Sequence, residues 1–307
     1  MLVLTSTDGM LEQEWLELRR KGLGGSDVAT AMGLSPWKSP MQLYLEKTGE
    51  IDPEPLTSEV VYWGTVLESV IADRFAELHP ELTVEEPKQM LVHSDYPFML
   101  ANLDRVVITS DGKQGVLEVK TTSATQSDKW KDDNVPIHYV LQVQHYLAVT
   151  GYDFAYIACL IGGQKYVERY IERDEELIAQ LIDKESEFWN CVETKTPPAW
   201  DGSEASWQIL RSLYPRAEKG KAVELPKDLV DTMKEFKELE DRSKEYEAVL
   251  KDINKARDAR KQVIVEAMAD AEVGLLGQWQ IKYPVVERKE YVSPATSYRR
   301  FSYKEVA

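Results

Sequence analysis

The chain has 307 residues, with 53 acidic and 37 basic side chains and a formal net charge of −16. Such acidity argues against general adhesion to nucleic acid. No apolar run approaches the ~20 residues of a membrane span, and the N-terminus lacks a basic-then-apolar signal pattern. We therefore expect a soluble, cytoplasmic protein. Its two cysteines are too few for a disulfide framework or a cysteine-rich metal site.

Helical and strand patterns alternate through the first two thirds of the chain, which favours an α/β fold with a central mixed sheet flanked by helices. In chain order we expect helices at 11–21, from about Val28, at 39–48 and at 59–79, a strand at 82–92, a hairpin at 98–122, a helix at 136–151, strands at 152–160 and 166–171, and a helix at 175–192. Residues 197–215 read as irregular, because they begin with Pro197-Pro198 and end at Pro215.

A change of composition divides the chain into a core (1–217), a helical arm (218–273) and C-terminal strands (274–307). Residues 225–272 are rich in Lys and Glu, and their apolar residues recur at three- and four-residue steps, which is typical of a helical hairpin or a coiled-coil arm. The tail 298–303 reads as a terminal strand, although its alternating aromatic and basic residues could also grip DNA.

The candidate chemistry lies in the hairpin. Two β-branched runs flank Asp111-Gly112, so Asp104 and Glu118, which are equidistant from residue 111, should face each other at roughly 4.5–5.5 Å. Lys120 lies two residues beyond Glu118 and points to the same face. Two carboxylates this close repel unless a cation lies between them, and oxygen ligands suit Mg²⁺ or Mn²⁺. The pattern predicts metal-assisted phosphodiester hydrolysis, although a surface hairpin with ordinary charge pairing would give the same short pattern.

A wider set of motifs resembles the PD-(D/E)xK nuclease superfamily and, within it, the YqaJ-type viral recombinase family, which is related to lambda exonuclease. The matching segments are Arg19 to Asp27 with Met32 to Trp37, Gly64 to Glu68, Asp104 with Glu118 to Lys120, and Tyr139 to Tyr146. They occur in order between about residues 15 and 146. The resemblance does not cover the region after about residue 200.

The resemblance implies a role for each matched residue. Asp104, Glu118 and the Val119 carbonyl would bind metal, and Glu68 would complete a second metal site. Lys120 would orient the attacking water, Gln142 would position that water or the scissile phosphate, and Tyr139 would contact DNA. The cofactor would be Mg²⁺ or Mn²⁺, most simply as two ions. A solvated glutamate on a helix and a polar helix face remain alternative interpretations of Glu68 and Gln142.

The Gly-Gly-Ser segment suggests an anion site. Glycines let backbone N–H groups approach an anion closely, and a helix N-terminus adds a favourable dipole. By family analogy Gly25, Ser26 and Arg20 would bind a terminal 5′-phosphate of DNA. Arg19 is a near-equal candidate, because spacing from Ser26 does not separate the two arginines. A simple capped helix start is the alternative.

The metal-site pattern predicts a Mg²⁺-dependent nuclease, and the resemblance implies a double-strand-specific 5′–3′ exonuclease of phage or prophage origin that leaves a 3′ single strand. By resemblance it would act with a RecT-like single-strand annealing protein, and a ring of subunits could hold duplex DNA ends despite the acidic core. Two rivals remain. An endonuclease of the same superfamily would share the metal site, and a non-catalytic acidic protein that mimics DNA would suit the charge.

Overall fold

The computed structural model describes residues 1–53 and 58–285. Its helices are α1 (Glu12–Arg20), α2 (Gly25–Ala31), α3 (Pro40–Thr48), α4 (Glu59–Leu78), the 3₁₀ helix η1 (Ala124–Trp130), α5 (Ile137–Thr150), α6 (Glu175–Thr194), α7 (Glu204–Leu213) and α8 (Leu229–Met268). Its strands are β1 (Leu2–Ser6), β2 (Leu23–Gly24), β3 (Thr83–Glu85), β4 (Gln89–Val92), β5 (Met99–Asn102), β6 (Arg105–Ile108), β7 (Gln114–Thr122), β8 (Phe154–Ile161), β9 (Lys165–Glu172), β10 (Val273–Leu276) and β11 (Trp279–Lys282).

A five-stranded mixed sheet, in the order β3-β6-β7-β8-β9, forms the centre of the fold. Strands β7 and β8 are parallel, and the connection between them runs through η1 and α5, as a parallel pair requires. The β6–β7 hairpin turns at Asp111-Gly112, where Gly112 has a positive φ of 84° that its missing Cβ permits. Arg105 pairs with Leu117, so the register continued by one residue places Asp104 opposite Glu118.

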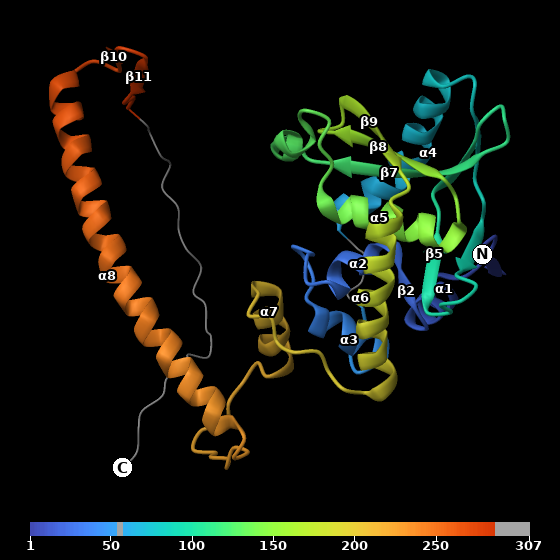
Figure 1. Cartoon of the computed structure of the whole chain (residues 1–307), viewed down its shortest axis with the longest axis horizontal. Coiled ribbons are helices and arrows are strands. Elements are labelled where there is room, and N and C mark those ends of the chain that lie inside the picture. Colours follow the sequence, from blue (N-terminus) through green and yellow to red (C-terminus); the bar gives the residue numbers. More distant parts are fainter. Residues whose placement is uncertain (54–57, 286–307) are drawn as a thin grey trace. The chain divides into compact units, whose positions relative to one another are not determined.

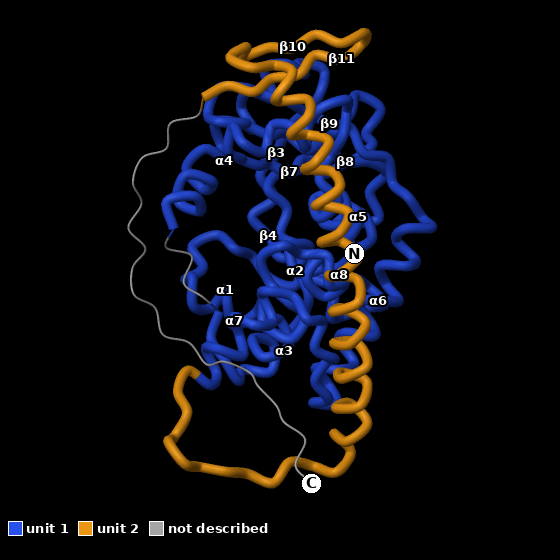
Figure 2. The backbone as a smooth tube through the Cα atoms, turned by 90° about the vertical axis from the view of Figure 1, so that its left-hand side faces the viewer, with its two compact units in different colours: residues 1–214 blue, residues 215–307 orange. Residues whose placement is uncertain are grey.

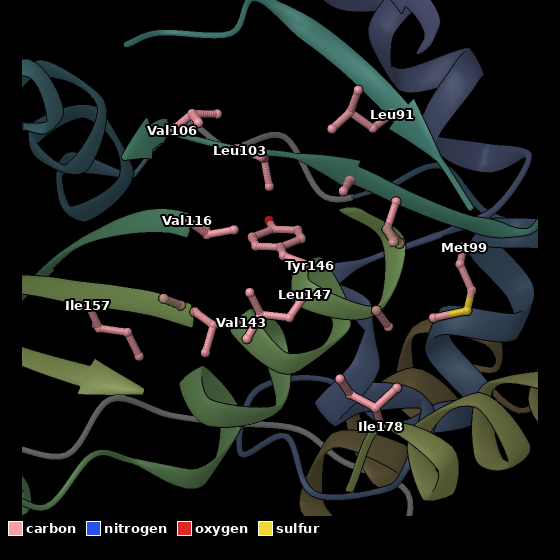
Figure 3. Close-up of a cluster of buried hydrophobic side chains, with 14 of the residues drawn as sticks. Leu91, Met99, Leu103, Val106, Val116, Val143, Tyr146, Leu147, Ile157 and Ile178 are labelled. Atoms are coloured by element: carbon pink, nitrogen blue, oxygen red, sulfur yellow. The ribbon is translucent and has the colours of Figure 1, made fainter. Parts of the chain in front are cut away.

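Helices cover both faces of this sheet (Figure 1). Helix α4 packs Ile71, Ala72 and Phe75 against Leu117 and Val119 of β7. Helix α5 packs on the opposite face, where Val143 and Leu147 join Val116. Figure 3 shows this second cluster, with Tyr146 lying among Leu103, Val116 and Leu147. Because side chains alternate along a strand, Glu118 and Lys120 share the α5 face with Val116.

A smaller four-stranded sheet, in the order β1-β4-β5-β2, lies beside the central sheet in the chain's first unit. The single strand predicted at 82–92 is wrong, because it is broken at Glu86 to Lys88 into β3 and β4, which belong to different sheets. Lys88 adopts a positive φ of 42° at this break. The predicted hairpin is interrupted in the same way, since Leu103 and Asp104 separate β5 from β6.

Two further expectations are corrected. Helix α2 begins at Gly25, so Gly25, Ser26 and Asp27 form its first turn instead of preceding it. Residues 197–215, expected to be irregular, contain α7, which is capped by the Ser203 side chain accepting a hydrogen bond from the Ser206 N–H. The sequence signal for α7 was this serine followed by a strongly amphipathic stretch.

The chain divides into two compact units, Met1–Tyr214 and Pro215–Ala307 (Figure 2). The second unit contains α8, one uninterrupted helix of 40 residues and not a helical hairpin, followed by the β10–β11 hairpin. The strand expected at 298–303 lies outside the described residues. None of the described helices combines the length and apolar character that a membrane span requires.

Candidate active site

Two buried carboxylates lie where β6 and β7 meet on the α5 face. Glu118 is 2% exposed, and its Oε2 has no hydrogen-bond partner among the described residues. Asp104 Oδ2 accepts a hydrogen bond from the Val119 N–H at 2.8 Å. Burial, followed by repulsion from Glu118, raises the pKa of Asp104 well above its usual range. Burial also raises the pKa of Glu118, which the nearby Lys120 only partly offsets. The pair therefore favours the approach of a cation.

Lys120 supplies one positive charge to this pair. Its Nζ lies 2.5 Å from Glu118 Oε1 and 5.1 Å from the centre of the Tyr139 ring. Burial lowers the pKa of Lys120, but attraction to Glu118 and Asp104 outweighs burial and raises it overall. The amine therefore stays protonated and acts as a fixed charge. Tyr139 adds a cation–π contact to the amine.

Gln142 fixes the orientation of the Glu118 carboxylate. Its Nε2 donates to Glu118 Oε1 at 2.6 Å and lies 3.1 Å from the Tyr146 hydroxyl oxygen. One oxygen of Glu118 is thus occupied by Gln142 and Lys120, which leaves the buried Oε2 available. Gln142 and Tyr146 are one turn apart on α5, so the same helix face carries both side chains.

Glu68 reaches the site from α4 and is held by an arginine. Arg105 Nη1 donates to Glu68 Oε1 at 2.9 Å and also to the Asp104 carbonyl at 2.5 Å. Arg105 pairs with Leu117, so it projects from the sheet face that α4 covers. Repulsion from Glu68 contributes to the raised pKa of Asp104. The charge of Glu68 is itself paired with Arg105.

The donors present fit a hard divalent cation. Within the part of the chain that the structure describes, no three His, Cys, Asp or Glu side chains gather into a metal-binding cluster. Magnesium, however, retains several waters and takes only one or two protein carboxylates. Asp104 and the unpartnered Glu118 Oε2, with the Val119 carbonyl, would hold such an ion, while Glu68 is held by Arg105.

The Gly-Gly-Ser segment forms a second polar centre at the start of α2. Arg19 Nη2 donates to Ser26 Oγ at 3.0 Å and to Asp27 Oδ2 at 2.9 Å, and Lys47 Nζ donates to the same Asp27 oxygen at 2.9 Å. Burial opposes ionisation of Asp27, but Arg19 and Lys47 outweigh it and hold the pKa of that carboxyl well below its usual range. We call Arg19, Ser26, Asp27 and Lys47 the Ser26 centre. Its two cations and one carboxylate give it a net positive charge.

The structure separates the two candidate arginines. Arg20 Nη2 lies 3.1 Å from Asp52 Oδ1 at the surface, whereas Arg19 lies against Ser26. A Cβ on Gly24 would approach the Arg19 guanidinium carbon to 2.8 Å, so a larger residue there would displace the guanidinium from this position. Arg19, and not Arg20, is the arginine of the Ser26 centre.

Gly25 connects the two centres. A Cβ at this position would lie 2.6 Å from the Tyr146 ring and 3.0 Å from Gln142 Cγ. The α2 start therefore packs directly on the part of α5 that holds Glu118. Of the residues predicted for the site, the structure joins Gly25, Ser26 and Arg19 to Gln142 in this way. Arg20 is not part of this group, because it pairs with Asp52 at the surface.

Four residues that complete these contacts received no site role from the sequence: Lys47 and Arg105, and also Asp27 and Tyr146, which lie within the matched motifs. Arg105 directly follows Asp104, and Asp27 directly follows Ser26, so proximity in sequence was an available signal for both. Lys47 lies 20 residues from Asp27, and nothing in the sequence indicates that it is buried against it.

Comparisons with known proteins identify the family and the fold of this chain. Residues 14–153 match the YqaJ-like viral recombinase domain. The crystal structure of an alkaline exonuclease (LHK-Exo) from Laribacter hongkongensis is similar to this chain with a TM-score of 0.50 and 20% sequence identity, over 66% of this chain and 97% of that chain. That protein has also been solved in complex with dAMP. The fold is thus shared with an alkaline exonuclease.

The uncharacterized protein YqaJ of Bacillus subtilis (strain 168) is 37% identical over 323 aligned residues, which cover 99% of this chain and 98% of the relative. The chain therefore belongs to the YqaJ-like viral recombinase family. The similarity includes the second unit.

Proposed function

We propose that this protein is a Mg²⁺- or Mn²⁺-dependent exonuclease that digests duplex DNA from its 5′ ends and leaves 3′ single strands. The observation that carries the proposal is the buried Asp104–Glu118 pair, in which one carboxylate oxygen has no partner within residues 1–53 and 58–285 and a protonated Lys120 lies beside the other. Membership in a viral recombinase family supports the role in phage recombination.

Each residue has a part in the proposed hydrolysis. A divalent cation held by Asp104, Glu118 and Val119 would supply positive charge for the phosphate oxygens. Lys120 stays protonated, so it would orient the attacking water instead of removing its proton. Gln142 keeps one Glu118 oxygen engaged, which would leave the other to hold the cation. Water adds to phosphorus, the bond to the 3′ oxygen breaks, and a new 5′-phosphate remains.

The Ser26 centre supports end recognition. Arg19 and the Ser26 hydroxyl, at a helix N-terminus with net positive charge, suit a phosphate dianion. Because Gly25 joins this centre to Gln142, a bound terminal phosphate would set the register of the strand against the carboxylates. Each cut regenerates a 5′-phosphate, which would re-enter the centre and favour movement in one direction.

Two assembly features complete the proposal. Residues 1–218 carry a net charge of −17, so adhesion alone would hold DNA weakly. A ring of subunits around the duplex would retain it topologically. The 3′ strand produced would be the substrate of a single-strand annealing protein that acts as partner.

A second metal at Glu68 would require Arg105 to release that carboxylate.

The test compares linear and closed circular duplexes in Mg²⁺ and in EDTA, with 5′-phosphate or 5′-hydroxyl ends. We expect Mg²⁺-dependent digestion of linear DNA only, faster from phosphorylated ends. Cleavage of closed circles would instead favour an endonuclease of the same superfamily. Inhibition of another nuclease, without cleavage of the DNA itself, would favour the acidic mimic.

Arg19→Ala and Arg20→Ala form a matched pair for the phosphate centre. Losing a charged partner costs about 1.5–3 kcal/mol, which corresponds to roughly tenfold to a hundredfold in rate. Arg19→Ala should slow digestion of phosphorylated ends by that factor and reduce the preference for them. Arg20→Ala should leave both nearly unchanged. Equal effects of the two substitutions would remove the Ser26 centre from the mechanism.

A further inference from the structure

Helix α8 carries an apolar seam that its own unit leaves exposed. Among the described residues of α8, only Met268 is buried, where it packs against Gly274 at the start of the terminal hairpin. The exposed fractions of Leu239, Tyr246, Leu250 and Ile253 are 61%, 66%, 55% and 57%. These are large apolar areas on the surface of a helix about 60 Å long.

The seam has the spacing of a coiled coil. Its residues alternate in steps of four and three without a break over 26 residues, which is the 3.5-residue repeat of a left-handed supercoil. We define the α8 seam as Leu239, Ser243, Tyr246, Leu250, Ile253, Arg257, Arg260 and Ile264. The only cations in the seam are the two arginines, both in its C-terminal half.

The charges of α8 are divided between its two halves. Residues 229–250 contain seven acidic and four basic side chains, a net of −3, and residues 251–268 contain three acidic and five basic ones, a net of +2. A helix of this kind is complementary to a reversed copy of itself. We propose that α8 pairs with α8 of a second copy of this chain as an antiparallel coiled coil.

One antiparallel register accommodates every seam residue. With the two-fold axis between Leu250 and Ile253, each of these residues meets the other in the second copy, and Leu239 meets Ile264. Arg257 then lies against Tyr246 of the other copy, where a guanidinium can stack on the ring, and Arg260 lies against Ser243. Both arginines thereby enter the acidic half of the other helix.

A parallel pair in register is disfavoured by the same residues. It would place Arg257 against Arg257 and Arg260 against Arg260 in the seam, with like charges in contact. Within α8, Arg257 pairs only with the adjacent Asp258, at 3.1 Å, and both side chains are more than half exposed. Such a surface pair is worth little and does not prevent Arg257 from entering an interface.

The proposed contact is isologous, since the same surface serves both copies. It therefore differs from the head-to-tail contacts that would close a ring, and it does not depend on the nuclease proposal. Two chains, or two rings, would be joined through their α8 helices.

The first experiment measures particle mass of the full chain by light scattering after size exclusion. Arg257→Glu with Arg260→Glu should halve the mass of the wild-type particle, because glutamates would enter an acidic half-helix. Lys251→Glu with Lys255→Glu changes the net charge equally on the outward face, and it should leave the mass unchanged. Circular dichroism verifies that both double variants remain helical. Identical masses for all three proteins would overturn the proposal.

The second experiment tests orientation by disulfide formation in a Cys191→Ser background, because Cys159 is buried and Cys191 is partly exposed. A tagged Ser243→Cys chain is mixed with an untagged Arg260→Cys chain under mild oxidation. The antiparallel register predicts mixed disulfides and little cross-linking of either chain alone. Self-cross-linking of Ser243→Cys alone would show a parallel pair, and no cross-linking in the mixture would exclude the contact.

Discussion

The two carboxylate oxygens of Glu118 lie in different electrostatic environments. Its side chain is buried, one oxygen binds Gln142 and Lys120, and the other has no partner among the described residues. An unpaired buried polar atom costs stability, so its presence here calls for a functional explanation. Burial raises the pKa values of Asp104 and Glu118, and the single positive charge of Lys120 beside two carboxylates only partly offsets it.

We expect Asp104→Ala, Glu118→Ala and Lys120→Ala each to abolish DNA cleavage with the fold intact, because the three groups act as one unit. Asp104→Ala and Glu118→Ala should also weaken Mn²⁺ binding measured by calorimetry, and Lys120→Ala should do so much less. Circular dichroism provides the folding control. Substantial Mg²⁺-dependent digestion by any of the three variants would refute the site.

A methyl group at Gly25 should have a large effect. Its Cβ would lie 2.6 Å from the Tyr146 ring and 3.0 Å from Gln142 Cγ, so Gly25→Ala must displace the residue that orients Glu118. We expect a stability loss of about 1–3 kcal/mol from overpacking, together with reduced cleavage and weaker metal binding. The readouts are urea unfolding and calorimetry.

Gly64 provides the matched control, since it is also helical but its Cβ would meet only Thr121 Oγ1, at an ordinary 3.7 Å. Gly64→Ala should be neutral or stabilising by up to about 1 kcal/mol. A neutral Gly25→Ala would show that α2 and α5 can separate without disturbing the carboxylates.

Helix α5 connects most of the features that define the site. It carries Tyr139 against Lys120 and Gln142 against Glu118, and its Tyr146 lies in the core cluster of Figure 3. Its position is fixed by a fully buried pair: His145 Nδ1 lies 2.9 Å from Glu185 Oε1 of α6, and Nε2 lies 2.8 Å from the Leu100 carbonyl of β5. Both ring nitrogens face acceptors, which favours the doubly protonated imidazolium.

The stability of the chain should depend on pH through this pair. Burial lowers the pKa of His145, but Glu185 outweighs burial and raises it above its usual value. A raised pKa in the folded state contributes stability that is present below about pH 6.5 and is lost as the pH rises through the folded value. Glu185→Gln should therefore cost about 1–3 kcal/mol near pH 6, and the loss should shrink toward pH 9.

Urea unfolding of wild type and variant at several pH values measures this difference. Lys184→Gln, which removes one partner of an exposed pair with Glu187 on the same helix, is the control, and it should cost less than about 1 kcal/mol with no such trend. A loss that does not shrink toward pH 9 would mean that His145 is already neutral in the folded protein.

The division of the chain into two units separates the proposed chemistry from the proposed assembly. All residues of the carboxylate and Ser26 centres lie in Met1–Tyr214, and α8 lies in Pro215–Ala307. The 37% identity to the Bacillus subtilis protein covers both units.

A chain ending at Tyr214 should therefore fold, bind Mn²⁺ and digest linear duplex DNA. Its particle mass should lack the contribution of the α8 contact, and long duplexes should be digested less processively because assembly is impaired. Calorimetry, light scattering and product length measure the three properties. If the truncated chain binds no metal, the second unit takes part in forming the site. If mass and processivity do not change, the second unit is passive.

Local pattern was enough to predict much of this protein. The hairpin symmetry about Asp111 gave the register that places Asp104 opposite Glu118, and period-two alternation put Lys120 on the same face. The ordered motifs between residues 15 and 146 indicated the family and the mixed α/β core. These features depend on a few neighbouring residues, and that is why sequence alone specifies them.

Contacts between distant segments required the tertiary structure. Arg19 and Arg20 are equivalent by spacing, and only the contacts with Gly24, Ser26 and Asp27 select Arg19. The pairing of Arg105 with Glu68 joins residues 37 positions apart on different elements. The break of 82–92 into β3 and β4 arises because each half pairs with a different sheet. Tertiary packing thus decided which of several locally equivalent side chains reach the site, because burial and partner choice depend on residues that lie far apart in the sequence.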